Sequence, residues 1–203
     1  METSDPRVDR TRRKVLAATL ELIHDEGWDG LSQAHVAARA GVGRATVYRH
    51  WPDLADLLSE ALTSAELDEH SAPTGDLRDD LVDELRAFAR AMSTKRYGKI
   101  MTALIDRAEW DPNLLAVRRR VTAAGTSVLR TIISDAKRAG QLRSGADEQL
   151  LIAQLVGPIS YRRFHSGQAV TKKFVAQIVD HALSAHALMD AGVRSVEHSE
   201  APN

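Results

Sequence analysis

The residues from 34 to 51 constrain the fold more than any other stretch, and they read AHVAARAGVGRATVYRHW. Small apolar residues at helical spacing, Ala37 among them, predict a short first helix. Gly41 follows, and glycine adopts a left-handed backbone at a helix end without a steric penalty. A second short helix is then expected over residues 44–50, with Val47 on its inner side. A small residue at 37, a glycine at 41 and a β-branched residue at 47 have the spacing that is typical of a helix-turn-helix. The small residue lets the two helices cross closely.

The outer side of the second helix is basic. Three arginines and no acidic residue occur between Arg39 and Trp51. The whole chain has a formal net charge of -1, so binding of nucleic acid must depend on such a local patch. The segment is therefore predicted to bind DNA. The alternative is a helical hairpin whose basic side is only solvated.

The run from 37 to 52, AARAGVGRATVYRHWP, resembles the DNA-binding motif of the tetracycline-repressor (TetR) family of bacterial transcription regulators. Its aromatic-rich end, residues 48–52, is the most family-specific part. The similarity extends upstream to about Arg10 and more loosely downstream to the last helix. The resemblance implies an all-α fold: an N-terminal three-helix DNA-binding head with the helix-turn-helix, and a larger C-terminal helical bundle for regulation and dimerisation. The composition agrees, because only 4% of the residues are aromatic and strands favour aromatic residues.

The chain is expected to divide into a DNA-binding domain over residues 9–53 and a helical ligand-binding and dimerisation domain over residues 54–190. Disordered tails are expected at 1–8 and 191–203. One helix of the body is expected to run from 111 to about 140. No cysteine is present, which excludes disulfides and zinc fingers. No apolar run reaches membrane-spanning length and the start of the chain is polar, so a cytoplasmic location and no membrane partner are expected.

Arg44 and Thr46 are the expected contacts to base edges, because arginine suits guanine and threonine suits a thymine methyl group. The other residues expected on the DNA side, as phosphate contacts or beside them, are Arg12, Arg13, Ser32, Gln33, Tyr48, Arg49, His50 and Trp51. Arginines crowd the start of the first helix, where the helix dipole disfavours cations. That placement indicates an anionic partner or, taken alone, an exposed basic side.

Several of these positions have a second interpretation. Ser32 is placed to cap the helix that follows it, and Gln33 is expected on the exposed side of that helix. Trp51 is more simply an anchor of the second helix than a phosphate ligand. Leu54 stands where many members of the resembled family carry a phosphate-binding lysine, so one contact is expected to be missing.

Two late helices are expected over residues 147–164 and 171–188, and the first contains the kink-forming pair Gly157-Pro158. By the same resemblance, these helices form a four-helix dimer interface with their symmetry mates. The residues expected in that interface are Leu151, Leu155, Ile159, Arg162, Phe174, Ile178 and Ala182. The alternative is that the apolar stripes of both helices are buried against the other helices of the same protomer. Dimerisation is also favoured physically, because one short helix contacts too few base pairs to be selective.

The resemblance implies an effector site between the helices that follow the head. The residues expected there are Leu85, Phe88, Met92, Met101, Leu104, Ile105 and Trp110. The same stripe of leucine and methionine is equally typical of a packed core. No buried charge is evident from the sequence, which favours a mainly apolar or aromatic effector.

Catalytic motifs are missing from the sequence. It contains no nucleophile elbow, no H-E-x-x-H helix and no phosphate-cradling glycine loop, so no enzyme activity, cofactor or metal site is expected. The expected function is that of a homodimeric, sequence-specific DNA-binding regulator, a repressor that a small-molecule effector releases from a palindromic operator. The alternatives are a ligand-independent regulator, a helical ligand-binding protein with weak DNA binding, and an enzyme built on the helical body.

Overall fold

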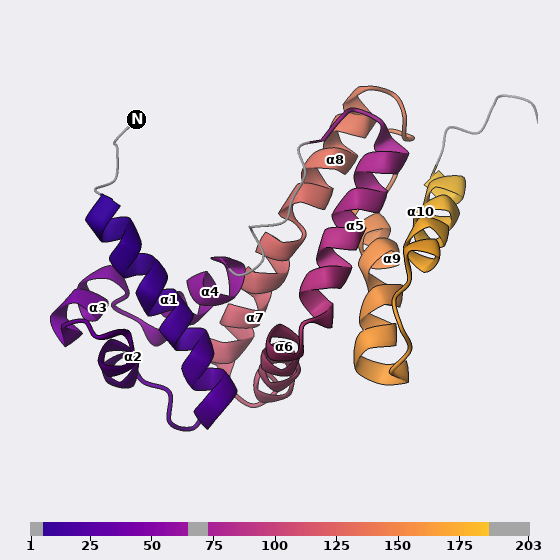
Figure 1. Ribbon diagram of the computed structural model, residues 1–203. Helices are drawn as coiled ribbons and strands as arrows, with labels where there is room; N and C mark the ends of the chain where they lie inside the picture. Colours follow the sequence, from indigo (N-terminus) through magenta and orange to yellow (C-terminus); the bar gives the residue numbers. More distant parts are fainter. Residues whose placement is uncertain (1–5, 65–72, 187–203) are drawn as a thin grey trace, which may run out of the picture.

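The computed structural model describes residues 6–64 and 73–186. Residues 6–8, predicted to belong to a disordered tail, are helical instead, since the first helix begins at Pro6 and proline is tolerated in the first turn of a helix. The rest of the predicted tails, and the last residues predicted for the final helix, lie outside the described residues. The described residues form ten α-helices and one π-helical turn and contain no β-strand, which confirms the all-α prediction (Figure 1). The elements are α1 (Pro6–Glu26), α2 (Gln33–Ala40), α3 (Arg44–His50), α4 (Leu54–Ser64), α5 (Leu77–Ser93), α6 (Lys95–Arg107), α7 (Pro112–Gly125), α8 (Ser127–Arg138), α9 (Glu148–Tyr161), η2 (Arg162–Ser166) and α10 (Lys172–His186).

The N-terminal head consists of α1, α2 and α3, which lie together at one end of the molecule (Figure 1). Val15, Val36, Ala37 and Val47 are buried in its core, and Trp51 packs against them at the end of α3. Further residues of this head core come from α4. α2 has 8 residues and α3 has 7, so both depend on this shared core, since isolated helices this short are marginal in water.

The turn between α2 and α3 has the predicted geometry. Gly41 has φ 65° and ψ 37°, a left-handed conformation that glycine adopts easily. Its N–H donates to the carbonyl oxygen of Ala38 at 3.2 Å, and the N–H of Val42 donates to that of Ala37 at 3.0 Å. These bonds satisfy the last carbonyl groups of α2. α3 starts directly after Gly43, so the predicted helix-turn-helix is confirmed.

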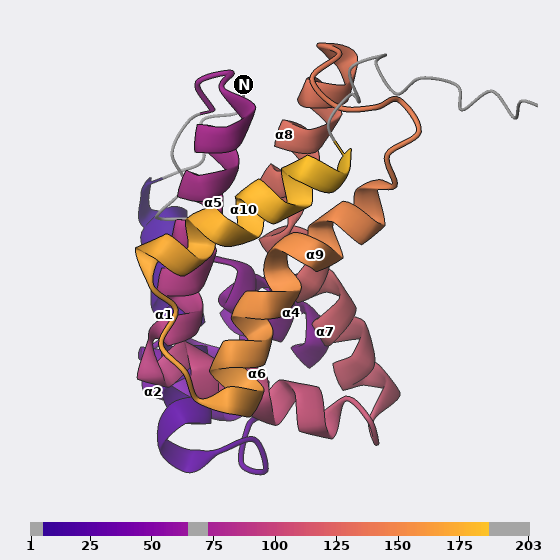
Figure 2. The same ribbon diagram turned by 90° about the vertical axis from the view of Figure 1, so that its right-hand side faces the viewer.

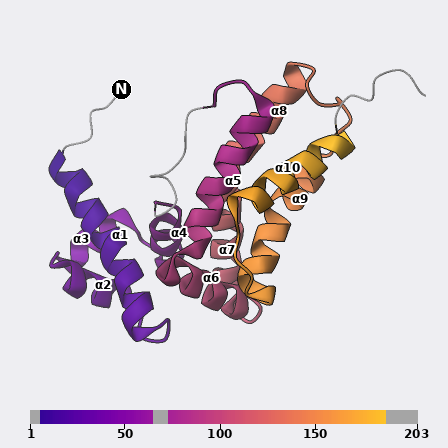
Figure 3. The ribbon, with the colours of Figure 1, turned by 45° about the vertical axis from the view of Figure 1, so that its right-hand side comes forward.

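The larger body has two cores, and the helices that form them can be followed in Figure 3. The first, with Leu81 and Leu155 fully buried, is formed by α5, α8, α9 and α10. The second, with Leu62 and Leu104 fully buried, is formed mainly by α4, α6 and α7 and includes residues of α1 and α5. Phe88 of α5 packs against both. Because α4 contributes to the head core and to this second core, it connects the head to the body.

The prediction of one helix from 111 to about 140 is wrong. α7 ends at Gly125 and α8 begins at Ser127. Thr126 between them has φ -110° and ψ 6°, and its Oγ1 donates to the carbonyl oxygen of Thr122 at 2.9 Å. Glycine is a poor helix former, and a threonine hydroxyl that bonds the preceding turn makes a break less costly. α9, in contrast, continues through Pro158 and then widens into the π-helical turn η2.

Candidate nucleic-acid interface

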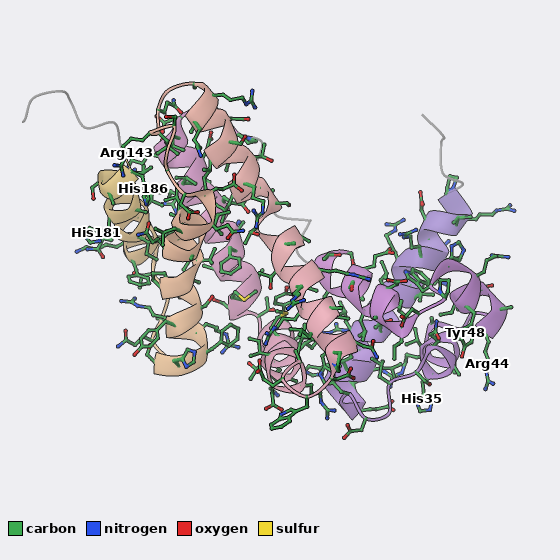
Figure 4. All side chains as sticks on the ribbon, turned by 180° about the vertical axis from the view of Figure 1, so that it is seen from behind. His35, Arg44, Tyr48, Arg143, His181 and His186 are labelled. Carbon is green, nitrogen blue, oxygen red and sulfur yellow. The ribbon has the colours of Figure 1, made fainter. Side chains whose placement is uncertain are left out.

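The outer side of α3 lies at the end of the head that points away from the helical body (Figure 4). Arg44, Tyr48 and Arg49 are exposed there, and Thr46 and His50 are partly buried beside them. The opposite side of α3 is anchored in the head core. A short helix held from behind in this way presents a fixed set of cationic and hydroxyl groups to a partner.

The start of α1 lies beside this surface, and a hollow of about 400 Å³ separates the two. Its lining consists of Arg7, Val8 and Thr11 of α1, Val42 and Gly43 of the turn, and Thr46, Arg49 and His50 of α3. Arg7 and Arg49 are cationic, and none of these described lining residues is acidic. Guanidinium and hydroxyl groups around one hollow suit a phosphate. Arg7 belongs to the basic start of the first helix that was expected to meet an anion, whereas Thr11 was not predicted, because only the fold shows that the first turns of α1 lie next to α3.

Arg12 and Arg13 have different surroundings. Arg13 is exposed on α1. Arg12 donates from Nη2 to Oε2 of Glu60 at 2.6 Å, and its Nε donates to Oε1 of the same residue. The guanidinium carbon of Arg12 also lies 5.7 Å from the centroid of the Trp51 ring. The charge of Arg12 is therefore balanced by a carboxylate of α4, whereas Arg13 is open to an anion.

Trp51 and Gln33 are structural contacts, which corrects their assignment to the DNA side. The Trp51 side chain is buried, and its Nε1–H donates to Oε2 of Glu60 at 2.9 Å. Gln33, predicted to be exposed, is buried as well, and its Nε2 donates to the carbonyl oxygen of Trp51. Carbonyl groups at a helix end lack intrahelical partners, and the amide of Gln33 satisfies one of them. Neither side chain is available to DNA.

Ser32 caps α2 as predicted, because its Oγ accepts a hydrogen bond from the N–H of His35 at 3.2 Å. It remains exposed at a helix N-terminus, a position that favours phosphate oxygens. Leu54 is partly buried and packs against both the head core and the second body core. A leucine at this position stabilises the junction of head and body.

α9 and α10 form the side of the body turned towards the viewer in Figure 2. Leu151, Leu155 and Ile159 of α9 were predicted to contact a partner there, but all three side chains are fully buried in the first body core. That part of the prediction is wrong, because a side chain with no exposed surface cannot contact a second protomer. These residues line the inner side of α9.

The outer side of the same two helices carries a groove of about 330 Å³. Phe174, Ile178 and Ala182 line it, although only 6% of Ile178 and 5% of Ala182 is exposed. Arg162 covers one face of the Phe174 ring, with its guanidinium carbon 3.3 Å from the ring centroid. Its Nη1 donates to the carbonyl oxygen of Ala169 at 2.8 Å, which ties η2 to the segment before α10.

Two large exposed side chains on α9 were not predicted. Leu150 is 51% exposed and Tyr161 is 61% exposed. Residues 150, 154, 157 and 161 follow the i, i+4, i+7, i+11 spacing that places them on one side of a helix. Apolar side chains therefore lie on the outer side of α9 as well as on its inner side, and the sequence pattern alone does not separate the two.

The predicted effector residues do not gather around one site. Leu85 is fully buried in the first body core, and Phe88 packs between the two cores. Three others belong to the second core: Met92, Met101 and Leu104. Trp110 is 86% exposed and Ile105 is 40% exposed, so both lie on the surface. The prediction that Trp110 and Ile105 line an internal site is wrong.

Buried charge does occur in the body, contrary to the sequence prediction. Asp80 and Glu84 of α5 are both buried. Asp80 accepts hydrogen bonds from the backbone N–H groups of Thr74 at 2.7 Å and Gly75 at 2.9 Å. Burial alone would raise the pKa of the Asp80 carboxyl, but these bonds outweigh it and hold the pKa below its usual value. The expectation of a mainly apolar or aromatic effector rested on an absence of buried charge, and that absence does not hold.

Among the described residues, no group of three or more histidine, aspartate or glutamate side chains could hold a metal ion. None of the described helices combines the length and apolarity that a membrane crossing needs.

Two family models match the chain. Residues 15–61 match the model described as bacterial regulatory proteins of the tetR family. Residues 71–182 match the model described as a tetracyclin repressor-like C-terminal domain. Together they cover most of the head and most of the described body.

Individual relatives agree with the family models. The chain is 30% identical over 175 residues to the DNA-binding transcriptional repressor TetR of Mycobacteroides abscessus, covering 83% of this chain and 90% of that one. It is 33% identical over 162 residues to an uncharacterised HTH-type transcriptional regulator of Mycobacterium tuberculosis, and the match covers 76% of this chain and 83% of that one. The crystal structure of the TetR family transcription regulator SCO0332 superposes with a TM-score of 0.70 at 32% identity, covering 86% and 97%.

Proposed function

Because the chain belongs to the TetR family of bacterial transcription regulators, we propose that it is a homodimeric repressor that binds a palindromic operator and is released by a small molecule. Members of this family are helix-turn-helix DNA-binding regulators rather than enzymes. The proposal adds the sign of regulation, the dimer, the effector and the contacting residues. DNA binding is assigned to residues 9–53, with Arg7 added at the start of α1, and effector binding and dimerisation to residues 54–190. The protein is placed in the cytoplasm, where bacterial DNA lies.

The observation that carries the proposal is the shared surface of α1 and α3. The start of α1 and the outer side of α3 border one hollow, whose described lining contains two arginines and no acid. In the proposed complex Arg44 and Thr46 contact base edges in the major groove. The residues that hold phosphates are Arg7, Arg13, Ser32, Tyr48, Arg49 and His50.

The dimer is assigned to the outer side of α9 and α10. Leu150 and Tyr161 are exposed there, and Phe174 lines the groove between the helices. Burial of such side chains stabilises an interface, since each large apolar side chain contributes about 1.5–3 kcal/mol when fully buried. Two recognition helices about one DNA turn apart, ~34 Å, then fit the two halves of a palindrome.

The route from body to head is assigned to α4. Arg120 of α7 forms an ion pair with Asp56 of α4. One turn further along the same helix, Glu60 holds Arg12 of α1 and Trp51 at the end of α3. A shift of α4 against α7 therefore moves the recognition helix, and it changes the separation of the two heads in a dimer.

Repression, rather than activation, is supported by the relative that carries the name of a repressor. The test is a gel shift with the DNA that flanks the gene of this protein, at low salt, with and without candidate effectors. We expect a retarded complex that is lost on addition of an effector. A complex that no effector disrupts favours a ligand-independent regulator, and the absence of any complex at low salt refutes the proposal.

A further inference from the structure

A second hollow, of about 380 Å³, lies between α5 and the start of α10, away from the DNA-binding head. Four of its lining residues come from one side of α5, at the spacing i, i+3, i+4 and i+7. The complete lining consists of Arg86, Ala89, Arg90 and Ser93 of α5, Thr94, and Val170, Thr171, Lys172 and Val175 at the start of α10. The hollow is within the range of ligand sites, which is about 300–1,000 Å³.

The rim of this hollow is cationic. Arg86, Arg90 and Lys172 belong to its lining, and none of the described lining residues is acidic. Asp83, one turn earlier on α5, accepts a hydrogen bond from Nη1 of Arg86 at 3.0 Å. The Nε of Arg86 is buried and has no hydrogen-bond partner among the described residues, so one donor of this guanidinium is unsatisfied. Lys172 also begins α10, where the helix dipole favours an anion.

The floor of the hollow is apolar. Ala89 and Val175 are buried, and Val170 is partly buried beside them. Two hydroxyl groups of the lining donate within the protein: Ser93 to the carbonyl oxygen of Ala89 at 2.7 Å, and Thr94 to that of Ala91 at 3.1 Å. Oγ1 of Thr171 accepts from the N–H of Phe174 at 3.2 Å. The guanidinium and ammonium groups are the charged groups of the lining that select a ligand.

We propose that this hollow binds a small organic anion, a carboxylate joined to a hydrocarbon or aromatic body. The carboxylate pairs with Arg90 and Lys172, and accepts from Arg86, while the body covers Ala89, Val170 and Val175. A charge-assisted hydrogen bond is about twice as strong as a neutral one, and the apolar floor contributes in proportion to the surface it covers. Neither an inorganic anion nor a neutral hydrocarbon satisfies both halves of the site.

Such a ligand bridges α5 and α10. α10 carries one side of the proposed dimer face, so occupancy of the hollow alters the position of α10 in the dimer and, through it, the separation of the heads. This regulatory consequence rests on the proposed function, whereas the binding itself does not.

Isothermal titration calorimetry of the full chain tests the binding with octanoate and 1-naphthoate as probes. We expect at least one of them to bind, and 1-octanol and inorganic phosphate to bind about tenfold or more weakly, because each lacks one half of the recognised chemistry. The double variant Arg90→Gln/Lys172→Gln should weaken carboxylate binding by about tenfold or more. The matched control is Lys99→Gln/Arg119→Gln, which removes two exposed cations that do not line the hollow and should bind as the wild type does.

Circular dichroism first establishes that each variant is folded, and Arg90→Gln alone replaces the double variant if that one is not. The site is refuted if neither carboxylate binds, if phosphate binds as well as the carboxylates, or if the hollow variant and the control bind equally. DNA binding is measured separately by fluorescence anisotropy. Carboxylate binding that leaves the DNA affinity unchanged supports the site and refutes only its regulatory consequence. A chain that binds no DNA refutes the proposed function, and the calorimetry still decides the site.

Discussion

The indole N–H of Trp51 donates to Oε2 of Glu60 at 2.9 Å, and this bond ties the end of the recognition helix α3 to the linking helix α4. Arg12 of α1 donates to the same oxygen at 2.6 Å. One carboxylate on α4 therefore holds two helices of the head. It also balances the charge of an arginine at the basic start of α1.

Glu60→Gln should strengthen the dependence of DNA binding on salt. The amide can still accept from Trp51, but it no longer neutralises Arg12, which becomes available to a phosphate. We expect the slope of log affinity against log salt to steepen by about 0.9, and the free energy of unfolding to fall by about 1 kcal/mol or less, since the ion pair is partly exposed. Anisotropy titrations at several salt concentrations measure the slope. Asp56→Asn is the control, because it removes a charge from α4 without freeing Arg12, and equal slopes in the two variants contradict the prediction.

Arg44→Ala should change the base preference of DNA binding, whereas Tyr48→Phe should change only the overall affinity. Arg44 is assigned to a base edge, so its loss should cost about 1–3 kcal/mol and relax the preference at one operator position. Tyr48→Phe removes only a phosphate-binding hydroxyl and should weaken binding to all sequences about equally. Competition binding with single-base operator variants separates the two. An unchanged preference profile for Arg44→Ala shows that base recognition lies elsewhere.

Leu150→Arg/Tyr161→Arg should produce a folded monomer. Both side chains are exposed on the outer side of α9, so two like charges there repel a symmetry-related copy without entering the core. Sedimentation velocity reports the oligomeric state. Trp110→Arg is the matched control, since it also places an arginine at an exposed aromatic position, 86% exposed, and should leave the dimer intact. If the double variant is still dimeric, the dimer interface lies on another surface of the protein.

Gly98→Ala should destabilise the protein when residue 163 is arginine and stabilise it when residue 163 is alanine. A Cβ at Gly98 would lie 2.8 Å from the guanidinium carbon of Arg163, whose Nε donates to the carbonyl oxygen of Met92 at 2.7 Å. In the wild type we expect the displaced guanidinium to cost more than the gain in helix propensity, for a net loss of about 1 kcal/mol. In an Arg163→Ala background the same substitution should stabilise by about 1 kcal/mol. Urea unfolding of the wild type, the two single variants and the double variant measures both effects on the free energy of unfolding. If Gly98→Ala changes that free energy in the same direction in both backgrounds, the contact between Gly98 and Arg163 is contradicted.

The helix-turn-helix was predictable because its determinants are local. Ala37, Gly41 and Val47 act within one short segment, through a close crossing, a left-handed residue and a core contact. Side-chain roles that depend on distant partners were not predictable. Gln33 bonds a carbonyl 18 residues away, and Arg12 pairs with a carboxylate 48 residues away.

The proposed dimer face shows a second limit of prediction from the sequence. The leucine stripe of α9 at 151 and 155 is as regular as a stripe for a partner would be, but it lies inside the protomer. Because apolar residues occur on both sides of α9, Leu150 and Tyr161 could be assigned to the outer side only after the helix was placed against its neighbours. The basic hollow beside α10 was not predictable either, since Arg90 and Lys172 are brought together only by the fold.

The central claim is that the protein is a symmetric dimer in which the outer side of α3 of each protomer recognises one half of a DNA palindrome. An unbiased selection of DNA bound by the full chain from a random pool tests it most directly. We predict enrichment of a palindrome whose half-site centres lie about 10 base pairs apart, with one position of each half-site losing its preference when Arg44→Ala is selected in parallel. Recovery of sequences no different from the starting pool would contradict it.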